Sequence, residues 1–107
     1  MIPSFYIKRG DRLPAFTRTL EDAAGAAVDL SGGSVQFRMQ PMQGGSLITG
    51  AATIVGATTG EVRYNWAAGD TDTIGMFLAE WEVTFSGSTE TFPNGGYDVV
   101  KITADLR

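Results

Sequence analysis

The chain has 107 residues, a hydrophobic share of 43% and a formal net charge of −4, and it contains no cysteine and no histidine. This length matches a single compact domain over residues 1–107, in which most large side chains are needed for the core because ordering each residue's backbone costs about 1–2 kcal/mol. The composition excludes disulfides, thiolate chemistry and histidine-based catalysis or metal binding. The acidic balance argues against nucleic acid or an anionic membrane as a partner.

The N-terminal stretch "MIPSFYIKRGDRLPAF" lacks the continuous apolar core of a signal peptide, and no run in the chain has the length of a transmembrane helix. We therefore expect a protein that is made and used without a cleaved leader. Within this stretch, Phe5 to Lys8 is predicted to be an edge strand. The next strand is predicted in "RLPAFTRTLED", where apolar residues alternate with threonines, and "DAAG" is predicted as the turn after it.

The middle of the chain contains three more strand signals. In "SVQFRMQP", Val35, Phe37 and Met39 alternate with polar residues, and Pro41 ends the strand because proline cannot donate to a ladder. The stretch "LITGAATIV" gives a weaker signal, since glycine and alanine supply little to pack, and "ATTG" follows as a turn. The stretch "EVRYNW" is predicted to bury its valine, tyrosine and tryptophan and to expose the residues between them.

The strongest alternation lies in "TIGMFLAEWEVTF". From Phe77 to Phe85 every second residue is apolar, whereas Glu80, Glu82 and Thr84 lie between them, as is typical of a strand with one buried and one solvated face. Then "SGST" is predicted as a hairpin turn, and "ETFP" and "YDVVKITADL" as the last strands. About seven to nine short strands without a helical period predict an all-β, antiparallel β-sandwich.

Two loops carry motifs that raise the question of binding. The triplet "RGD" at Arg9, Gly10 and Asp11 suggests cell adhesion, but glycine and aspartate also initiate turns, and the turn is favoured. The loop "GDTDT" places Asp70 and Asp72 two residues apart, where alternating oxygens could meet a calcium ion. The full calcium-loop pattern is missing, so a turn stabilised by aspartate side chains is favoured over a cation site.

Glu80 and Glu82 form a pair of carboxylates on one strand face. A glycosidase would need one of the two carboxyl groups to be buried, so that its pKa is raised. Alternation predicts that both are solvated, and we therefore expect neither a catalytic site nor an enzyme.

Aromatic side chains offer a second kind of ligand site, a platform on which sugars stack. Three of them occupy inward strand positions and are expected in the core, namely Tyr64, Trp66 and Trp81. Tyr6, Phe92 and Tyr97 are the aromatics that remain free for such a platform. Two or three exposed coplanar rings would be required.

The order of several short pieces extends over nearly the whole chain. They are Gly10-Asp11, Leu20 and Asp22 before a glycine turn, Asp29-Leu30, "VQFRM", Thr59-Gly60 before "EVRY", Asp70-Thr71 before Gly75, "EWEVTF" and Phe92-Pro93. In this order they resemble the immunoglobulin-like domain at the N-terminus of phage baseplate upper proteins. The resemblance implies an immunoglobulin-like β-sandwich in a phage or prophage virion, serving as a building block held by neighbouring copies.

The expected function is that of a non-enzymatic structural protein of a bacteriophage virion, assembled in the host cytoplasm. It would dock, without a cofactor, on the tail, the baseplate or the head–tail junction, with other virion proteins in multiple symmetric copies as its partners. Nucleic acid, membrane and small-molecule substrates are not expected. The alternatives are capsid decoration on the outside of the head and, less favoured, a carbohydrate-binding module.

Two segments are candidates for contact with such partners. They are "MIPSFYI" and part of "QPMQGGSLITGAA", with Ile2, Phe5, Tyr6, Ile7, Met42, Leu47 and Ile48 as the contact residues. The first segment is more apolar than a free terminus needs to be, and it could pack on a neighbour or add a strand to it. It is equally compatible with the first strand of the chain's own sheet.

Overall fold

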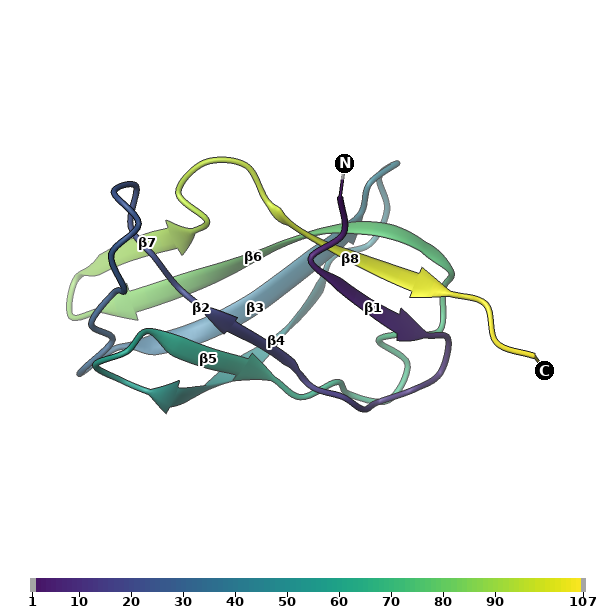
Figure 1. Cartoon of the computed structure of the whole chain (residues 1–107), viewed down its shortest axis with the longest axis horizontal. Coiled ribbons are helices and arrows are strands. Elements are labelled where there is room, and N and C mark those ends of the chain that lie inside the picture. The colour runs from purple at the N-terminus through teal and green to yellow at the C-terminus, as the bar shows by residue number, and fades with distance from the viewer. Residues whose placement is uncertain (1, 107) are drawn as a thin grey trace.

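The computed structural model describes residues 2–106, and within this range it contains eight β-strands and no helix (Figure 1). The strands are β1 (Phe5–Lys8), β2 (Phe16–Thr19), β3 (Ser34–Pro41), β4 (Ile48–Gly56), β5 (Glu61–Tyr64), β6 (Gly75–Phe85), β7 (Ser88–Phe92) and β8 (Asp98–Thr103). Met1 and Arg107, the two ends of the expected domain, lie outside the described residues. In the described part, no helix could cross a membrane. The eight strands confirm the all-β class and the predicted strand number.

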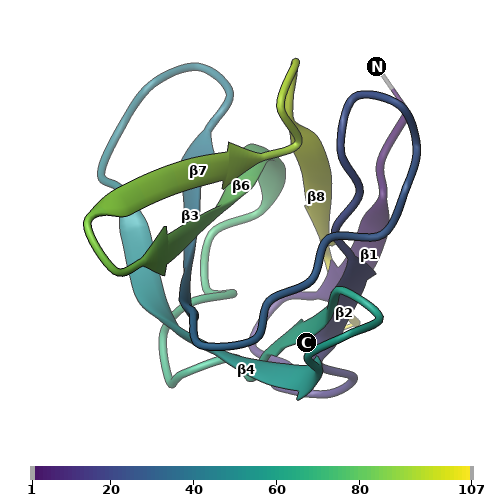
Figure 2. The same cartoon turned by 90° about the vertical axis from the view of Figure 1, so that its left-hand side faces the viewer.

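The strands form one sheet in the order β1-β8-β6-β3-β4-β5-β2, with β7 added beside β6. Strand β2 pairs with β5, and β3, β6 and β8 follow one another, which is the pairing of an immunoglobulin-like sandwich. All pairs are antiparallel, as expected, except β1 with β8, which is parallel. Seen end-on, the sheet curls into a nearly closed barrel (Figure 2).

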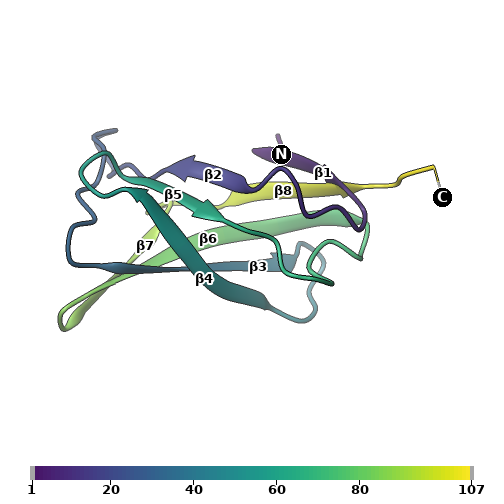
Figure 3. The ribbon, with the colours of Figure 1, turned by 90° about the horizontal axis from the view of Figure 1, so that it is seen from below.

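Strand β4 joins the two layers, so the sandwich is one continuous sheet. Its first part, Ile48 to Ala52, pairs with β3, whereas Thr53 and the residues after it pair with β5. The register shifts between Ile54 and Gly56, and such an irregularity increases the local twist of a strand. Figure 3 shows β4 running diagonally from β3 toward β5.

Aromatic rings close the gap between β1 and β2, the two ends of the strand order. The ring of Phe5 on β1 stacks on Phe16 of β2 with centroids 4.9 Å apart, and it also contacts Trp66. Such ring pairs contribute about 0.5–1.5 kcal/mol beyond the area that they bury. The seam of the barrel is therefore held by side chains.

Strand β6 supplies the centre of the core, as its alternation predicts. Phe77, Ala79, Trp81 and Val83 are each at most 1% exposed. The Phe37 ring from β3 lies 4.8 Å from that of Trp81 and 4.4 Å from that of Tyr64, so the rings form one continuous cluster. Burial of each such side chain contributes roughly 1.5–3 kcal/mol, which explains why the largest residues are inside.

Strand β4 is nine residues long, although its sequence gives only a weak strand signal. The reason is Gly50, which lies against the Tyr64 ring: a Cβ at this position would be 2.7 Å from Cε1 of that ring. The small residue is therefore required by a close approach. The strand from "EVRYNW" is shorter than expected, since β5 ends at Tyr64, although Trp66 beyond it is still buried.

The predicted turns are confirmed. Asp22 accepts backbone hydrogen bonds from Ala24 at 2.9 Å and Ala26 at 3.0 Å, which fixes the turn after β2. A two-residue loop, Ser86 and Gly87, joins β6 to β7, as its hairpin signal indicates. After β7 the chain passes through a second turn into β8. The side chains of Val100 and Ile102 on β8 point into the core.

Candidate functional site: an apolar outer face

The seven candidate contact residues divide into exposed and inward-facing side chains. Four are exposed on the surface: Ile2 at 89%, Tyr6 at 59%, Met42 at 40% and Leu47 at 53%. The other three face the interior of the single chain. Ile7 is a core residue at 5% exposure, and Phe5 and Ile48 pack against the core. Strand alternation is the cause, because Phe5 and Ile7 share the inward face of β1 while Tyr6 points outward.

The two candidate segments flank one face of the sheet. Both the N-terminal segment and the loop between β3 and β4 project on the same side in Figures 1 and 2. The pairing register explains this arrangement: Tyr6 is beside Lys101 of β8, and Lys101 is beside Met76 of β6. The row then continues to Met42, whose N–H donates to the carbonyl oxygen of Met76 at 2.9 Å.

Apolar side chains occupy much of this face. We define the outer face as Tyr6, Met42, Leu47, Met76, Leu78 and Tyr97. Val99 beside Leu78 also points outward, yet it is only 2% exposed and lies outside the core cluster, so its neighbours on this face cover it.

The outer face contains two hollows. One of ≈ 140 Å³ is lined by Leu47, Leu78 and Tyr97 together with polar residues of β3 and β6. The other, of ≈ 400 Å³, lies between the loop that carries Met42 and the start of β6 with Met76. The face is therefore uneven, with apolar floors that a protruding side chain could fill.

Sequence reasoning missed Met76 and Leu78 as part of a surface. Both stand on the same side of β6 as Glu80, Glu82 and Thr84, the residues that marked its solvated face. The apolar start of that otherwise polar face was a signal in the sequence, because outward positions of a solvated strand are expected to be polar.

Charged residues border the outer face. Arg38 of β3 forms an ion pair with Glu82 at 2.6 Å. Glu80 is the direct cross-strand neighbour of Arg38, and both glutamates are partly exposed, as alternation predicts. Within residues 2–106, no buried cleft encloses this pair of carboxylates.

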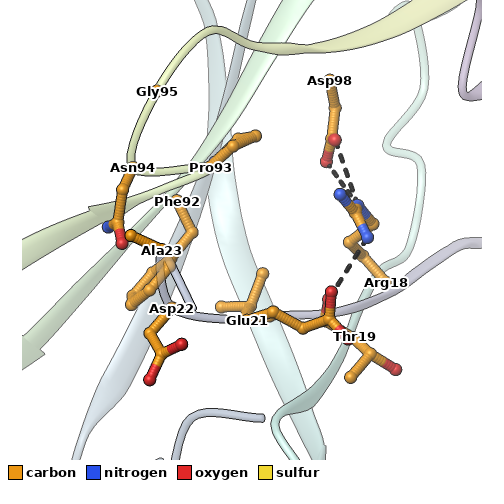
Figure 4. Close-up of a pocket in the computed structure, with 11 residues that line it drawn as sticks. Arg18, Thr19, Glu21, Asp22, Ala23, Phe92, Pro93, Asn94, Gly95 and Asp98 are labelled. Atoms are coloured by element: carbon orange, nitrogen blue, oxygen red, sulfur yellow. Dashed lines mark hydrogen bonds and ion pairs between the residues drawn. The ribbon is translucent and has the colours of Figure 1, made fainter. Parts of the chain in front are cut away.

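A separate pocket of ≈ 390 Å³ lies between the segment after β2 and the loop that joins β7 to β8 (Figure 4). Asp98 is 3% exposed at its wall and accepts two hydrogen bonds from Arg18 Nε and one from Trp81 Nε1, each at 3.0 Å. A buried carboxylate requires such partners. With both oxygens bonded, Asp98 ties β2, β6 and β8 together, so this carboxylate at the pocket wall has a structural role.

Asp98 was not identified from the sequence. It begins the inward series that continues with Val100 and Ile102, so a charged residue at an inward strand position was the available signal. Its partner Arg18 lies 80 residues away along the chain, where no local pattern links the two.

The "GDTDT" loop is a turn fixed by its own hydrogen bonds, as favoured from the sequence. Asp70 accepts a hydrogen bond from the Tyr64 hydroxyl at 2.5 Å and one from the Ala67 N–H at 2.9 Å. Burial and then this hydrogen bond raise the pKa of the Tyr64 phenol. Across residues 2–106, no group of three or more acidic residues is arranged to hold a metal ion.

The "RGD" triplet also lies in a turn. Gly10 has a φ of 83°, the Asp11 N–H donates to the Lys8 carbonyl oxygen at 3.1 Å, and Arg9 forms an ion pair with Asp105 at 2.9 Å. The Thr71 hydroxyl donates to the Asp11 carbonyl oxygen at 2.8 Å, which joins this turn to the "GDTDT" loop.

The aromatic candidates for sugar stacking are only partly available. Phe92 is 1% exposed, so its prediction as a free aromatic was wrong: it faces the core beside Trp81, its partner in the β6–β7 register. Tyr6 and Tyr97 are exposed, and both belong to the outer face. The predicted burial of the remaining three aromatics is confirmed.

In comparisons with known proteins, no protein family, curated protein or solved structure matches the chain.

Proposed function

We propose that this chain is a non-enzymatic structural protein of a bacteriophage virion, which docks as a small immunoglobulin-like module on the tail, the baseplate or the head–tail junction. The docking surface is the outer face. The chain uses most of its large side chains to hold the barrel together. Among the large apolar or aromatic side chains that stay exposed, Tyr6, Met42, Leu47 and Tyr97 lie on the outer face.

The observation that carries this proposal is the outer face, where four exposed side chains, Tyr6, Met42, Leu47 and Tyr97, adjoin the partly buried Met76 and Leu78. Met42 lines one hollow of this face with Met76, and Leu47, Leu78 and Tyr97, from three segments, line the other. Apolar patches of this kind on small soluble domains are typical of protein interaction sites. The resemblance to phage baseplate upper proteins supports a virion as the place of that interaction.

Labelling of particles tests the proposal. Antibodies raised against the purified chain should decorate phage particles that contain it at one fixed position in electron micrographs. Label at the tail tip or neck supports the docking site proposed here, whereas label over the whole head supports capsid decoration. Particles whose protein content, measured by mass spectrometry, lacks the chain would contradict both.

A variant separates docking from folding. Leu78→Glu places a charge in the centre of the outer face and should abolish incorporation into particles. Thr53→Glu is the matched control, because Thr53 is exposed on β4 in the other layer. Equal incorporation of the two folded variants would exclude the outer face as the docking surface.

A further inference from the structure

Two opposite charges without partners stand on either side of the centre of the outer face. Within residues 2–106, the side chains of Lys101 and Glu80 make no ion pair or hydrogen bond, since Arg38 pairs with Glu82 instead of Glu80. Unpaired charges beside an apolar patch favour a partner that brings the complementary charge.

The positions of these charges are related through Leu78. Lys101 pairs in register with Met76, two residues before Leu78, and Glu80 follows two residues after Leu78. Each charge therefore lies about 7 Å along the strand direction from Leu78, on opposite sides. A rotation that reverses the strand direction at Leu78 therefore exchanges the positions of Lys101 and Glu80 along the strand.

We propose that a second copy of this chain docks on the outer face as a two-fold dimer, with the axis in the plane of the face, perpendicular to β6 at Leu78. In this dimer the apolar centres meet, and Lys101 of each copy lies opposite Glu80 of the other, displaced by about one strand spacing of 4.8 Å. The interface is isologous, so the pair forms twice and the assembly closes.

The size of the protein is compatible with this interface. A stable interface takes about 800 Å² from each partner. The chain exposes 5985 Å² in total and measures 44 × 23 × 22 Å, so one long side can supply that area. The inference deepens the docking role proposed above by naming a second copy as the first neighbour, and it can be tested without particles.

The first test is sedimentation of the purified chain over a concentration series. The series extends to about 1 mM, so that a dimer with a Kd up to this value is detected. We expect a concentration-dependent dimer that Leu78→Glu converts to a monomer. If Leu78→Glu does not fold, Leu47→Ser and Tyr97→Ser, both at exposed positions, should each weaken the dimer. Thr53→Glu in the other layer should leave it unchanged. A monomer at every concentration would overturn the inference.

A charge exchange tests the arrangement of the two copies. Lys101→Glu and Glu80→Lys should each raise the dimer Kd by about tenfold, since each change replaces two attractive pairs by two repulsive ones. The double variant K101E/E80K should restore the original Kd, and added salt should weaken the wild-type dimer. A double variant as weak as the sum of its single changes would overturn the proposed geometry. A wild-type chain that stays monomeric but still labels particles at a fixed position would overturn the dimer and leave the virion role standing, so the two proposals fail separately.

Discussion

Arg18 on β2 binds both carboxylate oxygens of Asp98 on β8 through its Nε at 3.0 Å, although 80 residues separate them in the chain. Replacing Arg18 with methionine keeps a long side chain and removes the charge, so the buried carboxylate keeps only its bond from Trp81. Removal of one partner of a buried pair costs about 3–5 kcal/mol. Because Arg18 is itself 39% exposed, we expect a loss of about 2–3 kcal/mol in the free energy of unfolding, measured by urea denaturation.

The control for this prediction is Asp98→Asn, which removes the charge that Arg18 neutralises. Arg18→Met should cost clearly less in the Asp98→Asn background than in the wild type, because the two residues are directly bonded. Equal costs in both backgrounds would show that Arg18 contributes through packing alone.

Gly50→Ala is expected to destabilise the protein by about 1–3 kcal/mol, the usual cost of overpacking a core. The added Cβ would stand 2.7 Å from Cε1 and 2.8 Å from the hydroxyl oxygen of Tyr64, so the ring must move. Thermal or urea denaturation measures the loss. Gly95→Ala serves as the control, since no atom lies within 4 Å of a Cβ there. Two equally mild variants would contradict the close approach.

The strands were predictable where the signal is local. Alternation alone placed Phe77, Trp81 and Val83 in the core, and the proline at position 41 ended β3 as expected. The same rule, applied to β1, would have separated the inward Phe5 and Ile7 from the outward Tyr6. The prediction of contacts in that segment rested on its overall apolar character and did not take the alternation into account.

The rest depends on residues that meet only in the folded chain. Gly50 weakens the strand signal of β4. The reason for a glycine at this position is seen only in the folded chain, where the Tyr64 ring from β5 lies over it. The strand that contains Leu78 was interpreted from its buried residues, so the outward position of Leu78 was missed. Tyr97, from a loop, lines the same hollow as Leu78. Contacts of this kind are set by the register of paired strands, which no single segment specifies.

Calcium is expected to leave the stability of the protein unchanged. Oδ2 of Asp70 already accepts hydrogen bonds from Tyr64 and Ala67, which hold this carboxylate in the turn. Across residues 2–106, no group of three or more acidic residues is arranged to add further ligands. Thermal unfolding with calcium chloride and with EDTA checks this expectation. A saturable rise of Tm with calcium that Asp72→Asn abolishes would contradict it, because a ligand stabilises the state that it binds.

Tyr64→Phe is expected to flatten the alkaline part of the stability profile. Burial and the Asp70 hydrogen bond raise the pKa of the Tyr64 phenol above its ordinary 10.0, so the unfolded chain releases this proton first as pH rises. The stabilisation is therefore fully present below about pH 10 and declines above it by up to about 1.4 kcal/mol per pH unit. Urea denaturation between about pH 9 and pH 12 should show the wild type approaching Tyr64→Phe, while the exposed-site control Tyr6→Phe follows the wild type. A constant difference between wild type and Tyr64→Phe across this range would contradict the raised pKa.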